Sequence, residues 1–214
     1  MYTLLSEEKW MTFLNLSQKV LNQLGDKTGN SENTLQFLGF SLNLQTGNLQ
    51  DILQQNLASP ELKDPTMHTQ LTEVLIKYAS TDKHDRVNKL VNFKDFSGGY
   101  AYENAFTRRV VEPIAKLFGN CPLNLVTASE LLNGKVLEHG DCSIEIEALP
   151  GIPLTFILWT ADEEEALPPS AKVLFDESAN KFLNVEDLSW LSDLTVWRLS
   201  IAQRLLKNKQ TLKS

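Results

Sequence analysis

The stretch from Val91 to Pro113, VNFKDFSGGYAYENAFTRRVVEP, combines residue types that could hold a small molecule. Two adjacent glycines, Gly98 and Gly99, stand between aromatic residues, and an Arg-Arg pair follows on a predicted helix. A glycine-rich turn before a helix can bind phosphate through its backbone amides. The stretch lacks the spacing of a Walker loop or a dinucleotide fingerprint, so the first interpretation of the glycines is a sharp turn with positive φ.

A second interpretation makes this stretch one wall of a pocket. Aromatic side chains would face a flat apolar ligand, while the glycines would let it lie against the backbone. Arg108 or Arg109 could then pair with a carboxylate or phosphate, because ligand pockets are mostly apolar with a few placed polar groups. The alternative is that these aromatics belong to the hydrophobic core. The candidate ligand-binding residues in this stretch are Phe93, Phe96, Gly98, Gly99, Tyr100, Tyr102 and Arg109.

His139 and Asp141 stand at the junction between a loop and a predicted strand, and Trp159 ends the next apolar strand. A histidine with a carboxylate nearby could ligate a metal or accept a proton, so His139 is the candidate metal ligand. Asp141 and Trp159 join the candidate ligand-binding residues, and the glycine turn is expected to present Tyr100 and Tyr102 near His139. The alternative is a structural turn in which Asp141 bonds nearby backbone amides.

Other chemistry-bearing patterns carry no positive indication of an enzyme. The acidic run DEEE at 162–165 lacks the alternation of an EF-hand and is typical of a solvated loop. His68 lies near a predicted helix start and is expected on the surface. The sequence contains no Gly-x-Ser-x-Gly elbow and no His-Glu-x-x-His pair.

Composition restricts the class of protein further. The chain has 214 residues and a net charge of −7, without an obvious cluster of basic residues, which argues against nucleic acid as the main partner. No run of about 18 apolar residues predicts a membrane span, and the first residues do not resemble a signal peptide. Cys121 and Cys142 have no metal-type spacing and are expected to be free thiols. These features predict a cytoplasmic protein.

Hydrophobic periodicity predicts an α+β fold with a mainly antiparallel sheet packed by several helices. Residues 142–149 and 154–159 should be adjacent antiparallel strands joined by the Pro150–Pro153 turn.

Residues 1–214 are expected to form one domain. The alternative is that residues 1–90 form an N-terminal subdomain beside a core formed by residues 91–206. The predicted helices are 6–25, 66–80, 103–118 with a kink at Pro113, 127–132 capped by Thr127 or Ser129, and a last helix capped by Asn184. Further strands are predicted at 40–45, followed by a hairpin turn at TGN (46–48), and at 171–176. The last helix should bury a stripe made of Trp190, Leu194, Trp197, Ile201 and Leu205 and fray from Lys207.

Several segments of the second half together resemble the DUF3786 family, a domain of unknown function. The resemblance rests on FSGGYAYENAFTRRVVEPIAKLFG, a Gly-Asp before a strand, LPGIP leading into LTFILW, an acidic stretch, and LFDESA before ED. It covers about residues 93–199. It implies no established reaction, but it implies a setting in strict anaerobes, in which some relatives carry an iron–sulfur domain like one found beside corrinoid proteins. With two cysteines, this chain lacks that cluster domain and is expected to hold no iron–sulfur cluster.

The resemblance and the aromatic–glycine–arginine stretch together suggest a non-enzymatic binding protein for a flat cofactor. A corrinoid of the cobalamin type or another tetrapyrrole is the leading expectation, with a possible protein partner in corrinoid or one-carbon metabolism. The corrinoid motif D-x-H-x-x-G is not met, because Val87 follows Asp82 and His84 where glycine is needed. The alternative is a protein-interaction module without a small ligand, and the third possibility is an uncharacterised enzyme, a hydrolase or transferase.

Overall fold

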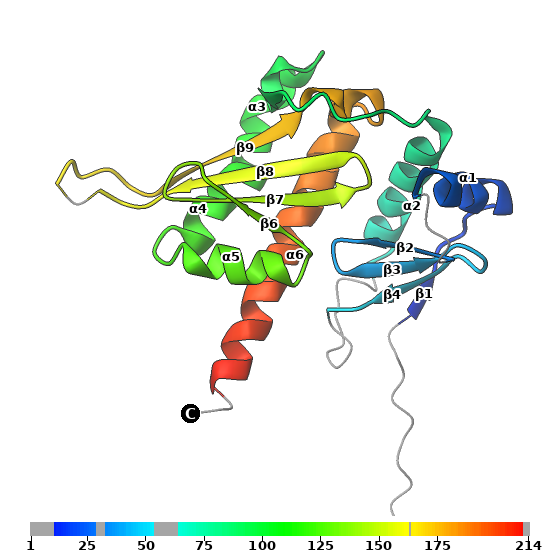
Figure 1. Cartoon of the computed structure of the whole chain (residues 1–214), viewed down its shortest axis with the longest axis horizontal. Coiled ribbons are helices and arrows are strands. Elements are labelled where there is room, and N and C mark those ends of the chain that lie inside the picture. The colour runs from blue at the N-terminus through cyan, green and yellow to red at the C-terminus, as the bar shows by residue number, and fades with distance from the viewer. Residues whose placement is uncertain (1–10, 29–32, 54–63, 163, 212–214) are drawn as a thin grey trace, which may run out of the picture. The chain divides into compact units, whose positions relative to one another are not determined.

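A computed structural model describes residues 11–28, 33–53, 64–162 and 164–211 of the chain. The internal contacts divide the chain into two compact units, Met1–Ser80 and Thr81–Ser214. Each unit contains one antiparallel sheet and its own helices (Figure 1). The predicted α+β class with a mainly antiparallel sheet is therefore confirmed. Within the described ranges, no helix combines the length and the hydrophobicity that crossing a membrane requires.

The first unit is built on a four-stranded sheet with the strand order β1-β4-β3-β2. At the β2–β3 turn, Leu38 and Gly39 have φ of 48° and 72°, the left-handed conformation that tight hairpins require. Gly47, with φ of 75°, lies in the predicted hairpin turn between β3 and β4, which is confirmed. The elements of this unit are β1 (Met11–Phe13), α1 (Gln18–Thr28), β2 (Thr34–Phe37), β3 (Phe40–Asn43), β4 (Asn48–Asp51) and α2 (Pro65–Ser80).

The predicted helix over residues 6–25 is confirmed from Gln18 to Gly25 and wrong for residues 11–17. Residues 11–13 pair as a strand with β4, and the helix begins only at Gln18, where the Ser17 hydroxyl accepts the Val20 N–H at 3.4 Å. Gly25 does not end α1 but lies inside it. The apolar residues of this segment have helical spacing, but residues 11–13 form a strand because pairing with a distant strand satisfies their backbone hydrogen-bonding groups. Residues 6–10 lie outside the described ranges, whereas the prediction of α2 is confirmed.

The second unit contains a five-stranded antiparallel sheet with the order β5-β9-β8-β7-β6. The central pair β7 and β8 turns at Pro150–Gly151 and aligns Ile144 with Phe156, so the predicted hairpin is confirmed. Helices α4 and α6 cross the sheet face that buries Ile146, Leu154 and Phe156 (Figure 1). The strands are β5 (Leu90–Asn92), β6 (Lys135–Leu137), β7 (Cys142–Leu149), β8 (Ile152–Trp159) and β9 (Ser170–Asp176); the helices are α3 (Gly99–Phe106), α4 (Glu112–Phe118), α5 (Leu123–Glu130) and α6 (Val185–Thr211).

Helices α3 and α4 are joined by a wide π-helical turn at Thr107–Val111, immediately before the proline at which a kink was predicted. The turn keeps one apolar face pointing in one direction: Phe106, Val110, Ile114 and Phe118 are all buried to 2% exposure or less. In a regular α-helix, residues twelve positions apart differ by about 120° around the axis. The extra residue of the wide turn takes back about 100° of that drift, so the four side chains stay aligned.

Helices α5 and α6 differ from the prediction in several details. Helix α5 starts at Leu123, and Thr127 does not cap it, because the Thr127 hydroxyl donates back to the Leu123 carbonyl at 3.1 Å. Ser129, the other predicted cap, is likewise inside α5. The Asn184 cap of α6 is confirmed, since its side-chain oxygen accepts the Asp187 N–H at 2.9 Å. The helix continues to Thr211 rather than ending near residue 207.

The predicted buried stripe of α6 is only partly right. Leu194 and Ile201 are buried, but Trp190, Trp197 and Leu205 are half-buried. The fully buried positions instead include Leu188, Leu191, Leu199 and Ala202, so the buried face is rotated from the predicted one. A helical wheel cannot separate two adjacent apolar stripes on a helix that also buries polar residues, here Ser192, Thr195 and Arg198.

Candidate functional site

Two of the predicted pocket aromatics lie in the hydrophobic core. Phe93 and Phe96 are 1% and 5% exposed. Phe93 stacks on Phe106 with the ring centroids 4.1 Å apart, and Phe175 lies within 6.0 Å of all three rings. The core alternative therefore describes these two side chains, and their ring faces are covered by other rings.

The glycine pair forms the predicted sharp turn. Gly98 has a φ of 84° and precedes the first residue of α3, while the Gly99 N–H donates to the Phe96 carbonyl at 2.8 Å. A Cβ atom on Gly99 would lie 2.1 Å from the Phe93 carbonyl oxygen, much closer than any contact allows. Gly99 is therefore needed because the backbone of the preceding turn passes directly against it.

Replacing Gly99 by alanine should lower the free energy of unfolding by about 2 kcal/mol, as overpacking against fixed backbone does. Gly25 offers a matched control, because a Cβ there would meet only Leu44 Cδ1 at an ordinary 3.7 Å. Gly25→Ala lies inside a helix and should raise stability by about 0.5–1 kcal/mol. Urea unfolding of both variants measures the two signs, and a Gly99→Ala chain as stable as wild type would show that the turn can shift at no cost.

The predicted site residues fall into two groups at opposite ends of the second sheet. Tyr102 belongs to the end at which α6 begins, because its hydroxyl donates to the Glu186 carboxylate. This hydrogen bond and the negative charge of Glu186 raise the pKa of Tyr102. Tyr100, two residues earlier, is 83% exposed. Phe175, which contacts Phe93 and Phe96, pairs with Leu154 at the same end of β8.

His139, Asp141 and Trp159 lie at the other end, where the Asp141 N–H donates to the Leu158 carbonyl at 3.0 Å. The Asp141 carboxylate accepts the N–H and the hydroxyl of Thr160, both at 2.8 Å, and these bonds lower the pKa of Asp141. About 17 Å of β8 separates Leu154 from Trp159 at the usual rise of a strand. The expectation that Tyr100 and Tyr102 lie near His139 is therefore wrong, while Asp141 forms the structural turn given as the alternative. In the described ranges, no three His, Cys, Asp or Glu side chains gather closely enough to hold a metal ion.

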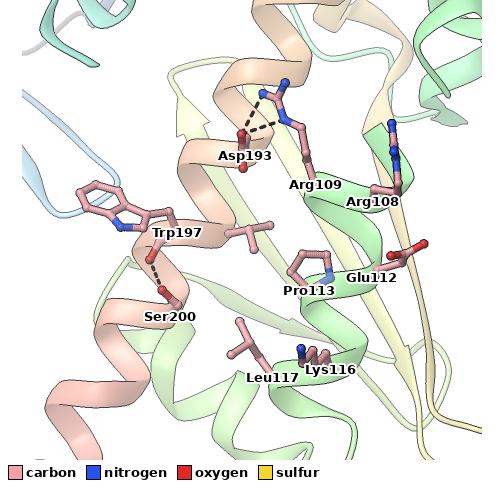
Figure 2. Close-up of a pocket in the computed structure, with 10 residues that line it drawn as sticks. Arg108, Arg109, Glu112, Pro113, Lys116, Leu117, Asp193, Trp197 and Ser200 are labelled. Carbon is pink, nitrogen blue, oxygen red and sulfur yellow. Dashed lines mark hydrogen bonds and ion pairs between the residues drawn. The ribbon is translucent and has the colours of Figure 1, made fainter. Parts of the chain in front are cut away.

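Of the predicted site residues, the two arginines, Arg108 and Arg109, line a groove of about 650 Å³ between α4 and α6. Figure 2 shows Arg109 and Asp193 facing each other at one end of this groove, with Pro113 and Leu117 farther along α4. The floor is apolar because Pro113, Leu117, Val196 and Trp197 contribute to it. The lining residues are Arg108, Arg109, Glu112, Pro113, Lys116, Leu117, Asp193, Val196, Trp197 and Ser200.

The charges around the groove are unevenly paired. Arg109 donates from Nη2 and Nε to one Asp193 oxygen, at 2.8 and 3.1 Å. Arg108 donates only to the Asn104 carbonyl of its own helix, at 3.3 Å. Among the side chains that the structure describes, neither Arg108 nor Lys116 has an acidic partner within 4.0 Å. The groove therefore offers an apolar floor beside two cations that are available to an anion.

The wide turn adds a backbone acceptor beside the groove. The Glu112 N–H bonds to the Thr107 carbonyl, and residue 113, being proline, has no N–H. The Arg108 carbonyl thus lacks both the α-type and the π-type helical donor that would normally reach it. A ligand that carries a hydroxyl or amide next to its acid could use this oxygen.

Sequence reasoning assigned no binding role to the groove residues other than the two arginines. Arg109 and Lys116 are seven positions apart, and so are Asp193 and Ser200, a spacing that places residues on one helix face. This seven-residue spacing can be seen in the sequence of each helix separately. The arrangement is made by two helices whose paired residues are 84 positions apart in the chain, and no local pattern brings them together.

Comparison with known proteins gives a family and no assigned activity. The family described as "Domain of unknown function (DUF3786)" matches residues 22–198. No curated protein and no solved structure matches the chain.

Proposed function

Because the chain belongs to the DUF3786 family, whose description assigns no reaction, we propose from the site itself that it is a non-enzymatic binding protein. The proposed ligand is a flat, partly anionic molecule in the groove between α4 and α6. A corrinoid or another tetrapyrrole is the candidate, since such a macrocycle combines a flat apolar body with acidic or amide edges. The protein would bind, store or pass on this molecule in the cytoplasm.

The observation that carries the proposal is the pairing of an apolar floor with available cations. Burying apolar surface contributes about 25 cal/mol per Å² before the costs of association. Arg108 and Lys116 lie on the α4 side of that floor. Their charge-assisted hydrogen bonds would orient acidic groups at the ligand edge.

The lining residues suit contacts with the edge of a macrocycle rather than coordination of a metal at its centre. The groove lining contains no histidine, cysteine or methionine. His139, the candidate metal ligand, lies outside it. We therefore assign His139 no part in holding a macrocycle here, and the residues present would bind the organic ring whether or not it carries a metal.

A protein-docking module is the second candidate, favoured by the exposure of single large apolar side chains. Tyr100 is 83% and Leu123 is 73% exposed. A partner in corrinoid or one-carbon metabolism would then take the place of the small ligand.

Titration of the full chain with protoporphyrin, haemin and cobalamin tests the proposal. Arg108→Gln and Lys116→Gln should each weaken binding of the acidic porphyrin by about tenfold, the equivalent of about 1.4 kcal/mol per lost charged contact. Arg204→Gln is the matched control, because Arg204 is an exposed arginine of α6 that does not line the groove. Tyr100→Ala and His139→Ala should bind as wild type does.

Two results would overturn the assignment. If wild type binds none of the three compounds, the docking module replaces the binding protein. If binding is lost in His139→Ala but kept in the groove variants, the ligand site lies at the other end of the sheet.

A further inference from the structure

The ion pair at one end of the groove has an incomplete geometry. Both Arg109 donors converge on Oδ2 of Asp193, at 3.1 Å from Nε and 2.8 Å from Nη2. The full fork of arginine matches two oxygens of a carboxylate, and here only one oxygen serves both donors. The two side chains are 53% and 39% exposed, so solvent reaches the pair. Exposed pairs of this kind hold together weakly.

The position of the pair places it in competition with a ligand. Arg109 lines the groove and Asp193 faces it across the end of the apolar floor (Figure 2). An anion on that floor would meet a guanidinium whose Nε–Nη2 edge is already occupied and a carboxylate that repels it. Binding an acid at this edge of Arg109 therefore requires that Asp193 give it up.

We propose that the groove selects flat carboxylic acids by carboxylate exchange: the ligand carboxylate displaces Asp193 and takes the Arg109 fork with both of its oxygens. This inference rests on the proposed function and names its ligand class and the residue that sets its affinity. Asp193 keeps Arg109 oriented in the empty groove and weakens the binding of anything that cannot replace it. Neutral flat molecules gain nothing from the exchange, so the acid is what the groove recognises.

Asp193→Asn should therefore tighten the binding of a flat acid. With naphthoate as the probe, we expect about threefold to fivefold higher affinity, the range set by the strength of an exposed ion pair. Glu112→Gln is the control, since it removes one negative charge from the same groove but no bond to Arg109. It should change the affinity less than about twofold. Naphthylmethanol, the neutral counterpart, should bind both variants and wild type alike.

Calorimetry on the full chain separates the outcomes, with circular dichroism showing that each variant is folded. The Arg109→Gln, Asp193→Asn double variant should lose the gain, because the exchange needs the guanidinium. The exchange is overturned if Asp193→Asn binds naphthoate no more tightly than Glu112→Gln does, or if the neutral alcohol gains as much affinity as the acid. In either case, binding that still depends on Arg108 and Lys116 upholds the groove as the ligand site. Absence of binding by every variant overturns the groove and the exchange together.

Discussion

Replacing Phe175 by alanine should lower the free energy of unfolding of the second unit by about 4 kcal/mol. Phe175 is fully buried, and its ring lies 5.5 to 6.0 Å from those of Phe93, Phe96 and Phe106. Truncation leaves a cavity among three rings that the stacked Phe93–Phe106 pair cannot fill by small movements, and such cavities cost about 3–5 kcal/mol.

Tryptophan fluorescence during urea unfolding reports mainly on this unit, because three of the four tryptophans, Trp159, Trp190 and Trp197, belong to residues 81–214. Leu174→Ala is the control on the neighbouring position of β9, where the side chain is only half-buried. It should cost about 1 kcal/mol. A loss below about 1 kcal/mol for Phe175→Ala would show that the aromatic cluster is not the centre of this core.

Removal of the Asp176 carboxylate is expected to cost about 3 kcal/mol. The side chain is 2% exposed and accepts hydrogen bonds from the backbone N–H groups of Val87 and Asn88 at 3.0 and 2.6 Å. It also accepts the N–H and the hydroxyl of Ser178, at 2.9 and 2.5 Å. Asp176→Ala leaves these donors without their acceptor, and each buried donor left unsatisfied costs about 1–3 kcal/mol.

The effect of this substitution should depend on pH in a defined direction. Burial alone would raise the pKa of Asp176, but the bonds from Ser178, Val87 and Asn88 outweigh burial and lower it. A carboxyl with a lowered folded pKa stabilises the fold above its unfolded pKa, and this contribution is lost as the pH falls through the folded pKa. The difference in unfolding free energy between wild type and Asp176→Ala should thus be largest near neutral pH and shrink below about pH 4.

Urea unfolding at several pH values tests this dependence. Asp162→Asn serves as control, because Asp162 is an exposed carboxylate that accepts the N–H groups of Glu164 and Glu165 in a surface turn. Its cost should stay below about 0.5 kcal/mol. A difference for Asp176→Ala that does not change with pH would mean that the charge of the carboxylate adds nothing to its hydrogen bonds.

The parts of the fold that sequence reasoning identified are those set by local rules. The strict alternation from Ile144 to Ala148 requires a strand with one buried face, and the Pro150–Gly151 turn brings β8 back beside it. Asn184 caps α6 through a bond three residues away, and Gly98 turns because glycine adopts its φ of 84° without the steric cost of a side chain.

The parts that sequence reasoning missed depend on distant partners. Met11–Phe13 is a strand only because β4, more than thirty residues later, offers its edge. Trp197 was placed in the core because its spacing suits a buried stripe, yet two stripes on α6 satisfy that spacing. The candidate site was assembled in one place from Tyr100, Tyr102 and His139, because sequence order does not reveal that β8 lies between them.

The wide turn at Thr107–Val111 sets how much the chain can change in length between α3 and α4. Deletion of one residue there would let the backbone close into an ordinary α-helix, with no hydrogen bond lost. The deleted residue would also take with it the rotation of about 100° that the wide turn compensates, so α4 would keep nearly the same angular relation to α3. Ile114 and Phe118 would then stay on the side that faces the sheet. Loss of a second residue would rotate α4 against α3 by about 100° and turn both side chains away, so this helix should tolerate the loss of one residue but not of two.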